Sequence, residues 1–402
     1  MKAALVKKPE VVQILLAAGA TVGLLEAILL GEYDTVHALL DAGTDVNLSA
    51  RSGATALQGA AGQENVSIVE LLLLHGADVN RADSNGHTAL TRAAAKDHQE
   101  ILSLLLAAGA TVGVVEAAML GDIDRMHSFL SQGADIESSN ASGLTPLMAA
   151  AANGRVACVQ SLLEKGADIH ATARFGYTPL SYAVTCHRAD VVNLLLDRGL
   201  DIDAQDPEGN DALRGQTLLH HAAFDRDGDN MVRLLLARGA KTDLQTASGH
   251  RPLHMAVMGR SLVSIGLLLD AGADIDAAGF HSQTPLMMAA QTPYSEGIID
   301  LLLKRGASVN ATDERGGRAL NVAMMLGNTQ VVEKLLHAGT DVNFLERYQY
   351  GMLDSIDESS KADILALLQA HGAELPRFGF DFQESDAPPP AACNSDDRNQ
   401  VP

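Results

Sequence analysis

The sequence predicts an all-α repeat solenoid, a stack of helix–turn–helix units, and three recurring features support this fold class. A helix-capping motif, a pair of apolar stretches at helical spacing and a helix-ending glycine return along the chain. The glycines return at a nearly constant interval, since Gly43 to Gly76 and Gly76 to Gly109 are both 33 residues. Periods of roughly 20–50 residues are typical of arrays in which each unit buries its apolar face against the next.

One unit is plainest in residues 144–170, LTPLMAAAANGRVACVQSLLEKGADIH. The Thr145 hydroxyl can accept a hydrogen bond at the start of a helix, and Pro146 suits the first helical position because its missing N–H costs nothing there. Three alanines make this helix slim, and Gly154 can end it in the left-handed conformation. A second apolar stretch at helical spacing then continues to Gly166. One unit is therefore helix, tight turn, helix.

The glycine that ends each second helix indexes about a dozen units. These glycines are Gly19, Gly43, Gly76, Gly109, Gly133, Gly166, Gly199, Gly239, Gly272, Gly306, Gly339 and Gly372. Two motifs recur in step with them, Thr-Pro-Leu at 145–147, 178–180 and 284–286, and Gly-Ala-Asp at 76–78, 133–135, 166–168 and 272–274.

With these motifs and this period, the chain resembles the ankyrin repeat family over nearly its whole length. The resemblance implies a curved stack of helix pairs with β-hairpin fingers projecting from one edge. It also implies a chain that binds other proteins. His220 and His254 match the histidine of the family's Thr-Pro-Leu-His motif, where the ring ties neighbouring turns together.

The solenoid is expected to span residues 1–375, with departures from the family pattern at several places. The first unit is truncated, because the chain starts inside it, and the finger hairpin is missing near residues 20–23 and 110–113. A finger insertion lies near residues 206–215. The C-terminal tail, residues 376–402, carries three consecutive prolines and is expected to be largely disordered.

An apolar run near the N-terminus, residues 11–30, follows three lysines and has the look of a signal peptide or a membrane span. However, the segment LLAAGATVG at 15–23 returns at 105–113, deep inside the chain. A targeting segment has no reason to be repeated within the array. We therefore expect two packed helices there and no membrane association.

Charge and cysteine content narrow the class of partner. A net charge of −21 would repel the phosphates of nucleic acid and an anionic membrane surface. The three cysteines form neither a disulfide framework nor a metal-ligand pattern, and Cys158 falls among the apolar positions of a second helix. A reducing, cytoplasmic compartment and a monomer are expected.

No catalytic motif is found, so the chain is predicted not to be an enzyme and to need no cofactor or metal. It has no phosphate-binding glycine loop, no His-Glu-x-x-His and no nucleophile elbow. Residues 225–229, DRDGD, resemble part of a calcium loop, but the closing glutamate is absent and a turn is favoured. Cys186 and His187 are adjacent on a helix end and point apart.

The predicted partner site lies on the finger tips of the C-terminal half, where large and basic side chains replace the small polar ones of the early fingers. Tyrosine and arginine are enriched in interface hot spots, so this row is expected to grip an acidic or extended partner segment. The open alternative is that the rings pack on neighbouring fingers and the arginines pair with nearby carboxylates. The residues are Arg174, Phe175, Tyr177, His250, Phe280, His281, Arg315, Arg347, Tyr348 and Tyr350.

The predicted function is a non-enzymatic scaffold or adaptor that binds a partner protein, of unknown identity, on the concave face of fingers and first helices. Two alternatives stay open. The first alternative is that the chain is the recognition arm of a larger enzyme or membrane protein, which its start inside a unit suggests. The second is that it is a host-directed microbial effector.

Overall fold

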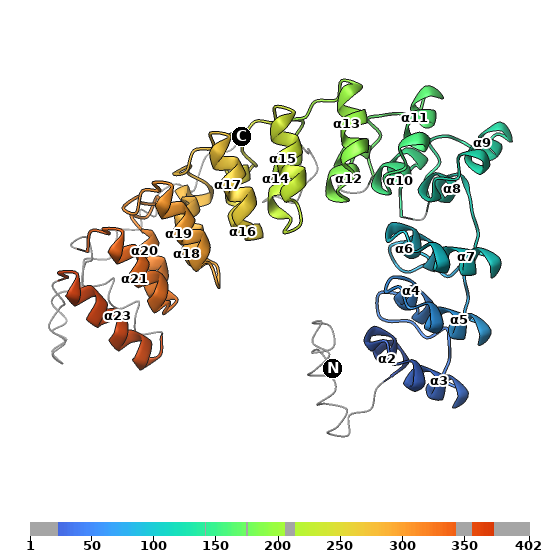
Figure 1. Ribbon diagram of the computed structural model, residues 1–402, viewed down its shortest axis with the longest axis horizontal. Helices are drawn as coiled ribbons and strands as arrows, with labels where there is room; N and C mark the ends of the chain where they lie inside the picture. Colours follow the sequence, from blue (N-terminus) through green and yellow to red (C-terminus); the bar gives the residue numbers. More distant parts are fainter. Residues whose placement is uncertain (1–22, 141, 174–175, 206–213, 343–355, 374–402) are drawn as a thin grey trace, which may run out of the picture. The chain divides into compact units, whose positions relative to one another are not determined.

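The computed structural model describes residues 23–140, 142–173, 176–205, 214–342 and 356–373. Within these ranges the chain forms helices joined by loops and turns, with no β-strand (Figure 1). The chain divides into two units, residues 1–319 and residues 320–402. In the first unit the helices follow one another as hairpins, each made of a first helix and a second helix. The predicted all-α repeat stack is thus confirmed.

In the first unit, each first helix packs against the first helix of the next hairpin, from α2 to α18. The hairpins are α2 (Leu24–Leu30) with α3 (Tyr33–Asp41), α4 (Ala56–Ala61) with α5 (Val66–Leu74), α6 (Ala89–Ala95) with α7 (Gln99–Ala107), α8 (Val114–Leu120) with α9 (Ile123–Ser131), α10 (Pro146–Ala152) with α11 (Val156–Glu164), α12 (Pro179–Thr185) with α13 (Ala189–Asp197), α14 (Leu218–Phe224) with α15 (Asp229–Ala237), α16 (Pro252–Gly259) with α17 (Leu262–Asp270), and α18 (Pro285–Gln291) with α19 (Glu296–Lys304). A short 3₁₀ turn, η3 (Phe280–Ser282), precedes α18.

The second unit begins within the next hairpin. It contains α20 (Ala319–Met325), whose first residue lies at the boundary, α21 (Thr329–His337) and α23 (Glu358–Ala370). Helix α21 packs against α23, and Asp357 caps α23 by accepting a hydrogen bond from the Ser360 N–H at 2.9 Å. This helix therefore starts at a polar cap, as its sequence suggests.

The hairpin of α10 and α11 shows how local sequence sets the helix ends. Thr145 Oγ1 accepts a hydrogen bond from the Met148 N–H at 3.3 Å, and Pro146 is the first residue of α10. Gly154 (φ 71°) turns the chain after α10, and Gly166 (φ 89°) ends α11. Both glycines lie in the left-handed region, where a side chain would be strained. The predicted caps and helix ends are confirmed here.

The core of each hairpin lies between the two helices and their neighbours. Ala149, Ala150 and Ala151 of α10 are completely buried, so adjacent first helices can approach closely. Leu162 of α11 is completely buried as well. Cys158 on the same helix is also buried, and this burial raises the pKa of its thiol. The prediction that Cys158 is a small buried side chain is confirmed.

The finger loop, which joins each second helix to the next first helix, differs from the expected β-hairpin. Within the described ranges only Ser49 and Thr55 form an isolated β-bridge. In the loop before α6, the Asp83 N–H donates to the His87 carbonyl at 2.9 Å, and the Ser84 N–H donates to the Ser52 carbonyl of the preceding loop at 3.0 Å. One or two hydrogen bonds make no ladder. The fingers are therefore hydrogen-bonded turns tied to their neighbours.

The link between α7 and α8 is short. Residues 108–113 join these helices, whereas residues 75–88 join α5 and α6. The Thr111 N–H donates to Asn80 Oδ1 at 2.7 Å, and the Glu116 carboxylate accepts the Gly113 N–H at 2.9 Å. The link thus stays attached to the preceding finger loop, and a glutamate caps α8 in place of a threonine.

Several expectations concern residues outside the described ranges and remain predictions. They are the truncated first unit before residue 23, most of the missing hairpin near 20–23, most of the insertion near 206–215, and the tail 376–402.

Candidate partner-binding face

Three finger-loop residues predicted to bind a partner lie against one another in the first unit. The centroid of the His250 ring is 6.3 Å from that of Phe280, and the Phe280 centroid is 3.9 Å from that of His281. Ser248 Oγ lies 2.9 Å from His250 Nδ1 and helps to fix the ring. Phe280 nevertheless exposes 47% of its surface. The Phe280 ring is therefore exposed to solvent on one side and contacts the rings of His250 and His281 on the other.

The backbone at the tip of this loop is held in an uncommon conformation. His281 (φ 53°) and Ser282 (φ 60°) both lie in the left-handed region, which the loop before α6 reaches with Gly86 (φ 81°). The His281 ring is hydrogen-bonded to the Glu314 carboxylate of the next finger loop. Such conformations cost about 1–3 kcal/mol for each residue, persist only where the surroundings hold them, and are concentrated at functional sites. The tip is thus a place where binding is worth testing.

Two buried histidines tie the finger loops to the first helices, as the family resemblance implies. His254 Nε2 lies 3.0 Å from the Ala277 carbonyl oxygen and 3.3 Å from that of Gln283. His220 Nε2 lies 3.1 Å from the His250 carbonyl oxygen. Because a carbonyl only accepts, Nε2 carries the proton in both rings. Burial lowers the pKa of each ring to about 4, so both are neutral at pH 7 and serve the structure.

Tyr177 belongs to a second ring cluster, which joins a finger loop to two first helices. Its ring centroid is 5.4 Å from that of Tyr182 on α12 and 5.7 Å from that of His221 on α14. All three side chains are half-buried. Burial raises the pKa of the Tyr182 hydroxyl, so this group stays neutral. Part of the open alternative therefore holds for Tyr177, whose ring packs on neighbouring elements.

The first helices contribute exposed side chains that the sequence hypothesis did not name. Counted from the capping residue, the fourth and seventh positions of a first helix lie on one face. Phe224 on α14 and Met258 on α16 occupy the seventh position and are 51% and 41% exposed. At the seventh position the earlier hairpins carry either a small residue, as at Gly62, Ala95 and Ala152, or a half-buried leucine, as at Leu30 and Leu120. In the described part of the first unit, a large apolar side chain is exposed at this position on α14 and α16.

We call the following set the partner face: Tyr177, Tyr182, His221, Phe224, His250, Met258, Phe280 and His281. Arg315 is exposed in the next finger loop, where its N–H donates to Asp313 Oδ1 at 2.9 Å. The other predicted residues lie outside the described ranges; they are Arg174, Phe175, Arg347, Tyr348 and Tyr350.

The acidic segment at 225–229 is a turn in which the carboxylates of Asp225 and Asp229 contact side chains of neighbouring hairpins. Helix α14 ends at Phe224 and α15 begins at Asp229. Asp225 Oδ2 lies 3.1 Å from His187 Nε2, and Asp229 accepts a hydrogen bond from Ser264 Oγ at 2.7 Å. In the described part of the chain, no cluster of His, Cys, Asp and Glu is placed to hold a metal ion.

The described residues contain no helix with both the length and the apolar composition needed to cross a bilayer.

Fold and surface together define a helical repeat protein of the protein-interaction class. The family model described as ankyrin repeats (3 copies) matches residues 24–116, 114–206, 205–279 and 267–345. The chain belongs to the ankyrin repeat family.

Three relatives illustrate the similarity, and in each of them the matched part of this chain covers at most 38% of the relative's length. A protein of Danio rerio named "Putative palmitoyltransferase ZDHHC13" is 35% identical over 124 residues, which are 31% of this chain and 19% of that protein. SH3 and multiple ankyrin repeat domains protein 2 of Homo sapiens is 33% identical over 138 residues, 34% and 8% of the two chains. Ankyrin repeat and SOCS box protein 16 of Homo sapiens is 31% identical over 172 residues, 40% and 38% of the two chains.

Proposed function

We propose that the chain is a non-enzymatic scaffold or adaptor that binds a partner protein across the partner face. The observation that carries this proposal is the exposure of Phe224, Met258 and Phe280, which lie on first helices that pack side by side and on the finger loop beside them. Aromatic residues are enriched among interface hot spots, and methionine adapts well to an apolar partner surface. Membership of the ankyrin repeat family supports a protein as the ligand.

The partner segment we propose is extended or acidic. A face that runs over successive finger loops suits an extended chain, because each loop can hold one part of it. Arg315 is exposed at the end of this row, which suits carboxylates on the partner. Arg174 and Arg347 stay predictions from the sequence, because they lie outside the described residues. Cys158 and Cys186 are free thiols, which fits a reducing compartment, and we therefore propose that the chain is cytoplasmic. We also propose that it is a monomer.

The test is affinity capture from a native lysate with the intact chain and a variant carrying Phe224→Ala, Met258→Ala and Phe280→Ala. The captured partner is then identified, purified and titrated against both chains. One truncation at a hot spot costs about 2 kcal/mol or more, so a single hot spot among the three residues is enough for the triple variant to bind about 30-fold more weakly, and further hot spots among them would increase the loss.

A matched control changes exposed apolar residues of the same hairpins that lie outside the partner face. Leu262, Val263 and Tyr294 are 49%, 49% and 82% exposed and lie at the start of α17 and in the turn before α19. The control with these three residues changed to Ala should bind the partner as the intact chain does. Equal loss in both variants, or no loss in either, would place the partner elsewhere.

A second candidate is the recognition arm of a larger enzyme or membrane protein. It is favoured by the small share of each relative that the chain spans, 19% in the palmitoyltransferase. Sequencing the transcript beyond both ends of this reading frame tests it. A further domain joined to the array would support this candidate, and stop codons at both ends would exclude it.

A further inference from the structure

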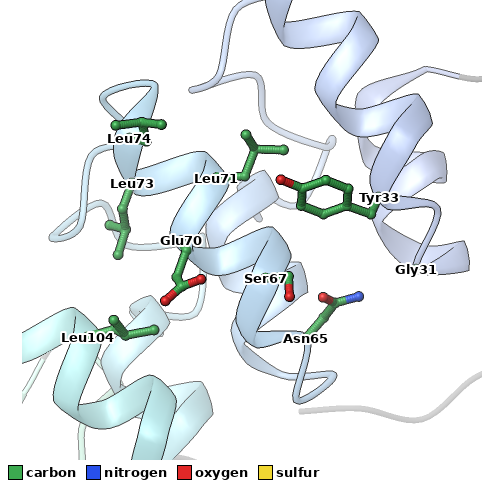
Figure 2. A pocket seen from close by; sticks show the side chains of 9 residues that line it. All are labelled: Gly31, Tyr33, Asn65, Ser67, Glu70, Leu71, Leu73, Leu74 and Leu104. Atoms are coloured by element: carbon green, nitrogen blue, oxygen red, sulfur yellow. The ribbon is translucent and has the colours of Figure 1, made fainter.

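A groove of about 730 Å³ lies on the second helices of the first unit, away from the loops and first helices that form the partner face. Figure 2 shows its walls: the Tyr33 ring from α3 points toward Leu71 on α5, and Glu70 on α5 points toward Leu104 on α7. Leu73 and Leu74 complete the apolar lining. Leu74 exposes 82% of its surface and Tyr33 exposes 41%.

Comparison between hairpins shows that this apolar surface is particular to one place. Leu74 stands two residues before the glycine that ends its second helix. The other hairpins of the first unit have a charged or small residue there, namely Asp41, Ala107, Ser131, Glu164, Asp197, Ala237, Asp270 and Lys304. Packing within the array therefore does not require a large apolar side chain at this position. Leu74 and Tyr33 are exposed on adjacent second helices and form one apolar surface with Leu71, which suits a contact with another molecule.

The three helices that line the groove carry acidic side chains and no strongly basic ones. Asp34, Glu70 and Glu100 are exposed on α3, α5 and α7, and these three helices contain no lysine or arginine. The histidines nearby are His37 and His75, whose ring nitrogens lie 2.8 and 3.6 Å from the Asp41 carboxylate. The groove therefore combines an apolar floor with a negative rim.

We propose that this groove is a second docking surface and that its occupant is a basic amphipathic helix of a partner protein. Ser67, Glu70, Leu71 and Leu74 follow the spacing i, i+3, i+4 and i+7 and form one stripe along α5. A helix laid on this stripe places apolar residues on Leu71 and Leu74 and basic residues near the carboxylates. A second copy of this chain fits less well, because its net charge of −21 would repel the rim.

The test uses the full chain and two synthetic peptides of about four helical turns, one of leucine and lysine and one of leucine and glutamate at the same spacing. Fluorescence anisotropy measures binding at low and at physiological salt. The leucine–lysine peptide should bind, and salt should weaken it, whereas the leucine–glutamate peptide should not bind. Leu74→Ser and Glu70→Lys should each weaken binding by about tenfold or more. Both residues are exposed, so thermal melting should show the fold intact.

Glu333→Lys is the matched control, because Glu333 stands at the same distance before Gly339 as Glu70 stands before Gly76. It should leave peptide binding unchanged. Equal weakening by Glu70→Lys and Glu333→Lys would mean attraction to the overall charge and would overturn the proposal. Equal binding of both peptides, or no binding of the leucine–lysine peptide, would overturn it as well. So would a dimer of the intact chain, seen by sedimentation, that Leu74→Ser converts to monomers.

Discussion

Single residues give the first prediction, which concerns the buried histidines. Burial lowers the pKa of His220 and His254 from 6.5 to about 4, so below pH 6.5 the unfolded chain binds protons that the folded chain does not. The contribution of the two neutral rings to the free energy of unfolding should be fully present above about pH 6.5. It should decrease toward pH 4, by up to about 3 kcal/mol for each ring. Urea unfolding between about pH 7 and pH 4.5 measures it.

Gln58 supplies the control for this prediction. It stands at the corresponding position of α4, and its Nε2 donates to the carbonyls of Arg81 at 2.7 Å and His87 at 3.0 Å. The variant His254→Gln should therefore keep the tie between helix and finger loop while losing the share of the pH dependence that His254 contributes. An unchanged pH dependence would show that other groups cause it.

The same scale separates what the sequence could predict from what it could not. The helix end at Gly166 follows from residues close in the sequence, whereas the tie made by His254 follows from the family resemblance, and both are confirmed. The contact of Phe280 with His250 and the pairing of His281 with Glu314 join different finger loops. Their existence depends on how closely successive loops stack, which no local pattern encodes.

Elements are stabilised by their caps, and α10 offers the plainest test. Thr145→Ala removes the hydroxyl that accepts the Met148 N–H, and this should lower the free energy of unfolding by about 0.5–2 kcal/mol. Thr145→Ser keeps the hydroxyl and should change stability much less. Urea unfolding of both variants beside the intact chain measures the difference. If serine and alanine cost the same, the hydrogen bond is not the source of the cap's effect.

At the scale of elements, the sequence predicted the helices well and the fingers less well. Apolar spacing and caps act within one helix, so the hairpin of α10 and α11 could be located from residues 144–170. The β-hairpins came from the family resemblance alone. The loop from Asp83 to His87 closes on two backbone hydrogen bonds, from the Asp83 N–H to the His87 carbonyl and from the Gly86 N–H to the Asp83 carbonyl, and is too short for strands. Phe224 and Met258 were not predicted, because the sequence hypothesis placed the large exposed side chains on the finger tips and not on the first helices.

The whole molecule should lose stability locally, because the helices of each hairpin pack mainly against the adjoining hairpins, with the Arg155–Asp97 ion pair as a contact that spans one hairpin. Leu162 is completely buried in α11, so Leu162→Ala should cost about 2–5 kcal/mol. Amide hydrogen exchange should quicken in α10 to α13 and stay unchanged in α23 of the second unit. Leu74→Ala, at an exposed position, should alter exchange little anywhere. A uniform change along the chain after Leu162→Ala would contradict a nearest-neighbour array.

The tip formed by His281 and Ser282 bears on how the whole molecule meets a partner. These residues reach a left-handed backbone without glycine, and the His281 side chain is bonded to the next finger loop. Residues with side chains have less backbone freedom than glycine, so this tip has little conformational entropy left to lose. A partner closing on Phe280 therefore finds a preorganised ring, and affinity there derives from order established during folding.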